Sequence, residues 1–185
     1  MQVEPLALAE VKLVRFPRHA DARGHFERTF DRETFAAAGL ADCSLQCSLS
    51  WNPHAGTLRG LHYQRPPHAE SKLVRCLSGR IFDVAVDIRP DSPTFGRWVA
   101  VELSPDNGLA IYIPQGFAHG FLTLDEGSLV QYQMAEPFVP GAGSGLRWDD
   151  AAIGIEWPLA PALIGDRDLA WGGLDSLASD AGRPR

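Results

Sequence analysis

Hydrophobic and polar residues alternate in short runs along most of the chain. The clearest run is Ile81–Ile88, in which Phe82, Val84, Val86 and Ile88 share one face. A two-residue period sustained over about four to eight residues predicts a β-strand with one buried face. Comparable runs predict further strands at Val11–Phe16, Ser44–Trp51, Leu58–Gln64, Ser71–Leu77, Arg97–Leu103, Leu109–Ile113, Gly120–Leu124 and Ser128–Met134.

Turn-forming residues separate these strands and keep them short. Asn52-Pro53 follows one strand, and SPDNG at residues 104–108 separates two others. The best helix candidate is Arg32–Ala38, which a glycine follows in the position that glycine favours after a helix. Strands at intervals of about 8–12 residues predict an all-β fold, an antiparallel jelly-roll barrel with short helical segments near the termini. A length of 185 residues fits one such domain over residues 1–185.

The alternation weakens beyond residue 140, where tryptophans become prominent. We expect Trp148, Trp157 and Trp171 to pack this C-terminal segment onto the barrel. The last residues, ASDAGRPR, are expected to fray.

Charge and cysteine content exclude several classes of protein. The net charge of −6 argues against nucleic-acid binding, although a few converging arginines can still hold a diphosphate. No apolar run approaches membrane length and the N-terminus lacks the basic head of a signal peptide, so a cytoplasmic protein without a membrane partner is expected. Cys43, Cys47 and Cys76 have neither the number nor the spacing of a disulfide framework or zinc site.

The segment RGLHYQRPPHAESKLVR, residues 59–75, holds the densest group of chemically active side chains. Two prolines interrupt its strand-like arms, which predicts an antiparallel β-hairpin. In that hairpin His62 and Lys72 are cross-strand partners and point to the same face, with Arg59 and Arg75 nearby. A solvated hairpin face would explain these charges, whereas burial of this face would indicate a functional site.

Two other strands add polar candidates. In the strand at residues 81–88, Asp83 lies opposite the apolar face; exposure to solvent is the simpler prediction, and the alternative is that it faces the polar cluster. In the strand at residues 128–134, Tyr132 shares a face with two apolar residues and should point inward. The alternative to a functional role is a core tyrosine whose hydroxyl bonds the backbone.

A metal site is the first chemistry to consider. PQGFAH, residues 114–119, resembles the second motif of the cupin jelly rolls, P-x-G-x-x-H. Cupins that bind metal add H-x-H from a first motif, but this chain reads HYQ there. A transition metal needs three or four convergent ligands, so His62 and His119 are too few unless His68 or Glu70 completes the set. We therefore predict no metal.

Acid–base chemistry suits the remaining side chains better. His62 is the natural base for abstracting a proton next to a carbonyl, because the unperturbed histidine pKa lies near neutrality. The ammonium of Lys72 would stabilise the oxygen of the resulting enolate. If Tyr132 returned a proton from the opposite face, the carbon would be inverted, so the set fits epimerisation.

Eight motifs together resemble the dTDP-4-dehydrorhamnose 3,5-epimerase (RmlC-type) family: DARGHF, LRGLHYQ, KLVR, G-x-IFDVAVDIR, SPTFG, IPQGFAHGF, GLRWDD and IEWP. They occur in the family's order over roughly residues 3–170. The resemblance implies a cupin-type jelly roll that works as a homodimer. It also implies epimerisation of a nucleotide-linked 4-keto-6-deoxysugar without a cofactor.

The resemblance implies roles for individual residues. His62 would be the base and Asp168, in DRD, its supporting carboxylate, with Asp166 as the second candidate for that support. Lys72 would neutralise the O4 enolate, and Tyr132 would be the acid. The implied substrate-binding set is Arg23, Phe26, Gln46, Arg59, His119 and Phe138.

The chain departs from the family pattern within this binding set and beside it. Arg28 stands where the family has a glutamate, with Glu27 one place earlier. QCS at residues 46–48 replaces Q-x-N, Phe138 replaces a tyrosine, and GAGSG at residues 141–145 replaces an acidic segment. These departures leave open the nucleotide and whether C3, C5 or both carbons are inverted.

Other functions remain as alternatives. Within the same fold, the chain would be a monofunctional 3- or 5-epimerase, or a ketoisomerase that moves the ketone between C3 and C4, with CDP- or GDP-linked sugars as further substrates. A metal-dependent cupin and a non-catalytic sugar-binding jelly roll are the alternatives from other classes. The latter would leave the His, Lys, Tyr and Asp set without a role.

Overall fold

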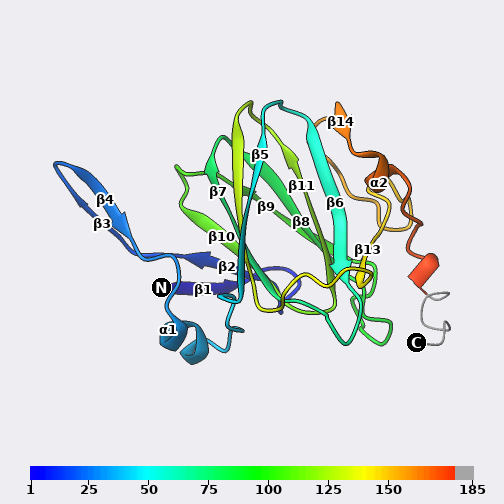
Figure 1. Cartoon of the computed structure of the whole chain (residues 1–185), viewed down its shortest axis with the longest axis horizontal. Coiled ribbons are helices and arrows are strands. Elements are labelled where there is room, and N and C mark those ends of the chain that lie inside the picture. The colour runs from blue at the N-terminus through cyan, green and yellow to red at the C-terminus, as the bar shows by residue number, and fades with distance from the viewer. Residues whose placement is uncertain (178–185) are drawn as a thin grey trace.

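Two β-sheets face each other in the computed structural model, which describes residues 1–177 (Figure 1). The segment ASDAGRPR, expected to fray, lies outside the described residues. The first sheet has six strands, in the spatial order β1 (Gln2–Pro5), β2 (Lys12–Arg15), β10 (Leu109–Ile113), β7 (Lys72–Ser78), β12 (Ser128–Met134) and β5 (Gln46–Asn52).

The second sheet closes the other side of the barrel. Its spatial order is β13 (Gly143–Gly145), β6 (Thr57–Gln64), β11 (Phe117–Thr123), β8 (Ile81–Asp87) and β9 (Trp98–Leu103). The strand β14 (Leu163–Ile164) pairs with β6 in parallel, while all other pairings are antiparallel. The predicted all-β jelly-roll architecture is confirmed.

The main hydrophobic core fills the space between the two sheets. Val74 and Ile111 reach it from the first sheet, and Ala85 and Phe121 from the second, all fully buried. Because side chains alternate along a strand, the polar residues two positions from these also face the barrel interior. Apolar and polar side chains therefore share the barrel interior.

A second core covers the outer side of the first sheet. The helix α1 (Arg32–Ala37) begins where the side chain of Asp31 accepts a hydrogen bond from the backbone N–H of Thr34 at 3.0 Å, and it buries Phe35 in this core. Such a side-chain cap satisfies one of the free N–H groups of the first turn. The helix predicted at Arg32–Ala38 is confirmed to within one residue.

A third core covers the outer side of the second sheet. Trp157 packs edge-on against Phe82, with ring centroids 6.0 Å apart, and its indole N–H donates to the carbonyl of Trp148 at 3.0 Å. The C-terminal segment thus packs onto the barrel through tryptophan, as the sequence predicts.

A two-stranded hairpin projects from the body of the molecule (Figure 1). It consists of β3 (Arg18–Asp21) and β4 (Gly24–Glu27), and its turn exposes Arg23 as predicted. At its base, the buried carboxylate of Glu27 lies 3.2 Å from Arg75 and 3.4 Å from Arg18. Arg75 therefore points to the outer side of the first sheet and anchors the hairpin, so the prediction that it lies near His62 and Lys72 is wrong.

The predicted hairpin between residues 58–64 and 71–77 is also wrong. β6 pairs with β11 and β13, whereas β7 pairs with β10 and β12, so the turn at the two prolines carries the chain from one sheet to the other. His62 lies opposite His119, and Lys72 lies opposite Met134 and Ile113. The two side chains nevertheless face the same barrel interior, from opposite walls.

The simpler prediction for Asp83, exposure to solvent, is also wrong. Both faces of β8 are buried, one against the barrel interior and the other against the third core, and Asp83 is 0% exposed on the interior face. Among the helices of residues 1–177, none has the length and hydrophobicity needed to cross a membrane.

Candidate active site

A histidine and a carboxylate from distant parts of the chain meet at the wall formed by the second sheet. Nε2 of His62, on β6, lies 2.6 Å from Oδ1 of Asp168, on the short helix α2 (Asp166–Leu169). The other carboxylate oxygen accepts the backbone N–H of Gly60 at 3.1 Å. Asp166 is exposed to solvent on the same helix, so Asp168 is the partner of His62.

Glycines allow this close approach. Gly60 has a φ of +135°, and a Cβ there would lie 2.5 Å from Cα of Gly120 on β11. Gly145 pairs with His62 in the sheet, and a Cβ there would collide with the indole of Trp171, whose N–H lies 3.4 Å from Oδ1 of Asp168. The last three residues of the GAGSG segment thus form strand β13 beside the histidine, and Gly145 leaves space for the indole.

The carboxyl group of Asp168 is ionised in this setting. Burial acts to raise its pKa, but the hydrogen bonds from His62, Gly60 and Trp171 together with the charge of His62 outweigh burial and lower the pKa below 3.8. An ionised carboxylate fixes the ring orientation of His62 and accepts the proton on Nε2. Nδ1 is then the ring nitrogen that remains to accept a proton.

A second histidine–carboxylate pair lies deeper in the barrel. Nε2 of His119 contacts both oxygens of Asp83, at 3.0 and 2.9 Å, and both side chains are buried. Burial raises the pKa of Asp83, and the adjacent His119 and Lys72 oppose that rise. This pair is more buried than the pair of His62 and Asp168.

Tyr132 reaches the same space from β12 on the opposite sheet. Its ring meets that of His119 edge-on at a centroid distance of 5.7 Å, which confirms that it points inward. Burial, reinforced by the negative charge of Asp83, raises the pKa of its hydroxyl well above the usual 10, so the phenol keeps its proton at neutral pH. Within residues 1–177 the hydroxyl has no hydrogen-bond partner, unlike that of a core tyrosine bonded to the backbone.

Lys72 completes the polar interior from the neighbouring strand β7. It shares the inward face of β7 with Val74, and its side chain is only 6% exposed. Its Nζ lies 2.8 Å from Oε1 of Glu70, in the turn between β6 and β7. His62, Tyr132 and Lys72 thus all face the barrel interior.

Three predicted binding residues lie on β6, on β5 and in the segment after β12. The guanidinium Nε of Arg59, on β6, donates to the buried side chain of Asn52 at 2.7 Å, while the rest of the side chain is exposed. The side-chain oxygen of Gln46, on β5, accepts the backbone N–H of Phe138 at 2.7 Å. Phe138 is itself 55% exposed.

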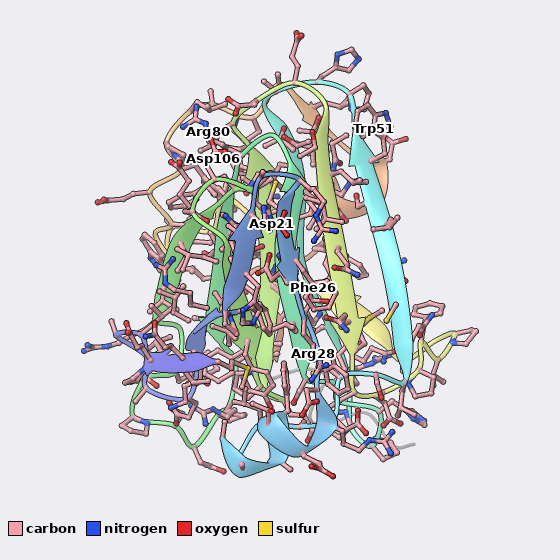
Figure 2. The ribbon with its side chains drawn as sticks, turned by 90° about the vertical axis from the view of Figure 1, so that its left-hand side faces the viewer. Asp21, Phe26, Arg28, Trp51, Arg80 and Asp106 are labelled. Carbon is pink, nitrogen blue, oxygen red and sulfur yellow. The ribbon has the colours of Figure 1, made fainter. Side chains whose placement is uncertain are left out.

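Two other predicted binding residues do not lie with this set. Arg23 and Phe26 belong to the projecting hairpin, where Arg23 pairs with Asp21 at 2.6 Å and Phe26 is 65% exposed. Figure 2 looks at the molecule from the side on which the hairpin projects and labels Phe26 on it. The neighbouring Arg28 is exposed and lies 3.5 Å from Asp31 at the start of α1.

Residues 1–177 contain no group of three His, Cys, Asp or Glu side chains arranged to hold a metal ion. The candidates that the sequence suggested are used elsewhere. Glu70 pairs with Lys72, and His68 lies 3.8 Å from Glu136.

Sequence reasoning missed several residues that support the site. Gln64 and Glu70 lie where the pattern predicts only a strand end and a turn, and they bond each other. Asn52, which bonds Arg59, lies where the pattern predicts only the end of a strand. A polar side chain at a strand end or in a turn carries no separate signal, because alternation indicates which face a residue takes but not which residues it contacts. For Asp83, the inward parity shared with Ile81 and Ala85 was the available signal.

Fold and site together define a cupin-like jelly roll whose interior holds two histidine–carboxylate pairs, a lysine and a protonated tyrosine. A family model described as dTDP-4-dehydrorhamnose 3,5-epimerase matches residues 5–176. The chain belongs to this family, and it is an enzyme of the isomerase class.

Individual relatives agree with this assignment. A dTDP-4-dehydrorhamnose 3,5-epimerase from Sinorhizobium fredii is 47% identical over 179 residues, which cover 96% of this chain and 91% of the relative. The solved structure of a dTDP-6-deoxy-D-glucose-3,5-epimerase from Legionella pneumophila, in complex with dTDP-4-keto-L-rhamnose, has a TM-score of 0.91 at 34% identity, with 97% and 95% coverage of the two chains. A 3'-monoepimerase from Streptomyces bikiniensis, in complex with dTDP-quinovose, has a TM-score of 0.88 at 31% identity, with 97% and 90% coverage.

Proposed function

We propose that this protein epimerises a dTDP-linked 4-keto-6-deoxyhexose at C3 and C5, without a metal or other cofactor. The observation that carries the proposal is the His62–Asp168 pair on one wall of the barrel, facing the protonated Tyr132 on the other. A base and an acid on opposite sides of the substrate are what inversion of a carbon requires. Family membership and the ligand of the Legionella pneumophila structure support the choice of substrate.

In the proposed first step His62 removes the proton next to the ketone. The C–H bond breaks, its electron pair forms a double bond to C4, and the negative charge moves to O4. The proton goes to Nδ1 of His62, and the ionised Asp168 stabilises the imidazolium through Nε2. The ammonium of Lys72 offsets the charge on O4.

In the second step Tyr132 donates its phenolic proton to the opposite face of the carbon. A new C–H bond forms there, the enolate electrons return to the ketone, and the phenolate regains a proton from solvent as His62 releases one. The raised pKa of Tyr132 suits this role, because the phenol holds its proton until a strongly basic carbanion is present.

The substrate shell follows from the same geometry. Arg59 is exposed, and its free N–H groups match the oxygens of a diphosphate. Phe138, which Gln46 holds by its backbone, presents an exposed ring to the nucleotide base. His119, beside Tyr132, lies on the sugar side.

A homodimer would bring Arg23 and Phe26 to this shell. The edge strand β5 carries Leu49 and Trp51 on its outer face, 63% and 58% exposed, and Figure 2 labels Trp51 on this side. An exposed apolar strip along a sheet edge is typical of a protein interface. A second copy docked there would let the projecting hairpin of each copy reach the site of the other.

A mixing experiment tests this arrangement. Arg23→Ala and His62→Asn homodimers should each be inactive, and exchanging their subunits should restore activity, because one site of the mixed dimer then has both wild-type residues. No restoration, with exchange verified by a tagged subunit, would place Arg23 in its own chain's site or outside the mechanism. Sedimentation of Trp51→Glu, expected to be monomeric, checks the interface.

Deuterium exchange tests the reaction itself. With dTDP-4-keto-6-deoxyglucose in deuterated water, the wild type should introduce deuterium at C3 and C5, and His62→Asn should introduce none. Label at a single carbon would indicate a monoepimerase, a precedent set by the Streptomyces bikiniensis structure. Exchange at the wild-type rate in His62→Asn would refute the role of the base.

Further arms of the experiment address the remaining alternatives. Activity only with CDP- or GDP-linked ketosugars would show that the substrate carries a nucleotide other than dTDP. A 3-keto product would indicate a ketoisomerase. Loss of activity on chelation, with a stoichiometric metal in the purified protein, would favour a metal-dependent cupin. The expected cytoplasmic location stays a prediction, which cell fractionation tests.

A further inference from the structure

Lys72 has an ion-pair partner that no step of the proposed mechanism uses. Its Nζ lies 2.8 Å from Oε1 of Glu70, and the two side chains are only 6% and 10% exposed. A buried ammonium without a partner is strongly unfavourable, so this carboxylate helps to determine where the ammonium lies. Glu70 belongs to the turn between β6 and β7, outside the barrel wall that carries Lys72.

Glu70 is itself held by a second buried side chain. Its Oε2 accepts a hydrogen bond from Nε2 of Gln64 at 3.1 Å. Gln64 is 5% exposed, and its amide also contacts the carbonyls of His68 and Pro137 and accepts the N–H of Val139 at 2.8 Å. The carboxylate therefore has a fixed position relative to the segment around Phe138.

A second carboxylate, that of Asp83, interacts with the charge of Lys72. The charge of Lys72 acts on Asp83, which lies deeper in the barrel and already contacts His119. The ammonium thus contacts the carboxylate of Glu70 in the turn and is attracted by that of Asp83 in the interior. Removing the charge of Glu70 would leave Asp83 as the attracting group and draw the ammonium toward the His119 pair.

We propose that Glu70, held by Gln64, is a positioning residue that keeps the ammonium of Lys72 where the O4 enolate forms. This inference rests on the proposed function, because it assigns Glu70 a role only through the step that Lys72 serves. Because Gln64 also holds the backbone on both sides of Phe138, the same side chain links the nucleotide end of the site to the reacting end.

A carboxylate is required at position 70 for a geometric reason. Its two oxygens accept from Lys72 and Gln64 at the same time. A glutamine there has one acceptor oxygen, so either Lys72 or Gln64 would face an NH₂ group. Glu70→Gln therefore preserves size and shape while breaking one of the two contacts.

The test compares four variants with the wild type: Glu70→Gln, Lys72→Met, the double variant, and Glu136→Gln. The last is a matched control, since Glu136 lies nearby and contacts His68 rather than Lys72. Steady-state kinetics, deuterium exchange and melting temperature are measured for each.

Glu70→Gln should lower kcat by about 10–100-fold. This magnitude is taken by analogy from metal sites, where removing the partner that orients a ligand has about this effect. KM should change little, and exchange and inversion should fall together because the enolate is common to both. Lys72→Met alone should lower kcat by about 10²–10³-fold. Glu136→Gln should match the wild type.

The double variant separates positioning from a purely structural role. If Glu70 acts through Lys72, adding Glu70→Gln to Lys72→Met causes no further loss of kcat and raises the melting temperature, because a buried unpaired carboxylate is removed. Wild-type kcat in Glu70→Gln, or losses that multiply in the double variant, would overturn the inference and leave the proposed function standing. Absence of exchange by the wild type with every nucleotide sugar would overturn both.

Discussion

Replacing Asp168 with asparagine should stop proton abstraction while keeping most of the stability of the fold. Oδ1 of Asp168 lies 2.6 Å from Nε2 of His62, and Oδ2 accepts the N–H of Gly60 at 3.1 Å. Asparagine has one oxygen, which the buried N–H of Gly60 requires. Its NH₂ group then faces Nε2 and can only donate, so His62 must carry its proton on Nδ1 and has no nitrogen left to accept one from the substrate.

The expected loss follows from this change of tautomer. The same substitution in Ser-His-Asp triads costs about 10⁴ in kcat for the same reason, which corresponds to about 5 kcal/mol in activation free energy. Asp168→Ala leaves the imidazole free to adopt either tautomer, so abstraction should fall less than with asparagine. The alanine variant should instead lose about 1–3 kcal/mol of unfolding free energy, because the N–H of Gly60 loses its partner.

Deuterium exchange into the sugar and urea unfolding, measured side by side, check both halves of the argument. Asp166→Asn is the matched control, since Asp166 is exposed on the same helix and should behave as the wild type. The reasoning fails if Asp168→Asn exchanges within tenfold of the wild type, or if alanine slows exchange more than asparagine does.

Three further predictions follow from the geometry. Tyr132→Phe should retain exchange through His62 while inversion, followed by NMR of the product, falls by about 10²–10⁴-fold; equal loss of both would argue against Tyr132 as the acid. Arg59→Ala should raise KM by about 10–100-fold, as expected for a charge-assisted contact, and lower the unfolding free energy by about 1–3 kcal/mol, because the buried side chain of Asn52 loses its donor; the same loss of stability with an unchanged KM would make Arg59 purely structural. Because the pKa of Asp168 is lowered in the folded state, its contribution to stability is present above pH 3.8 and is lost as the pH falls through the folded-state pKa. The unfolding free energies of the wild type and of Asp168→Asn, measured with urea, should therefore converge only in that acidic range. A difference between them that does not change with pH would show that the carboxylate does not titrate there.

The strands were largely predictable from the sequence, but their partners were not. Alternation in β12 correctly places Tyr132 on an inward face, whereas the common face of Lys72 and His62 was inferred from a hairpin that does not form. Alternation contains no information on which strands pair, and β7 pairs with strands far along the chain instead of with β6. The two prolines signal a reversal of direction, and a reversal within one sheet looks the same locally as a crossing to the facing sheet.

The burial of polar side chains was also not predictable from the sequence. Asp83 lies on a strand with two buried faces, and an apolar face on one side does not reveal whether the opposite side meets solvent or a second core. Glu70 lies in a turn, where charged residues are ordinarily solvated, and its burial depends on Gln64 and Lys72. Asp168 was found through the family motif, because a short helix after an irregular segment has no local pattern that points toward His62.

The wrong pairing would have produced a different chemistry from the observed one. In a single hairpin, His62 and Lys72 would lie side by side on one wall, and a carbanion formed beside them would be reached from one direction. In the barrel, His62 stands on the second sheet, while Lys72 and Tyr132 lie on adjacent strands of the first. A sugar ring between the two sheets then has the proposed base on one side and the proposed acid on the other, with the enolate-stabilising ammonium on the acid's wall. The crossing of the chain at the prolines is therefore what makes inversion, rather than simple proton exchange, available to this set of side chains.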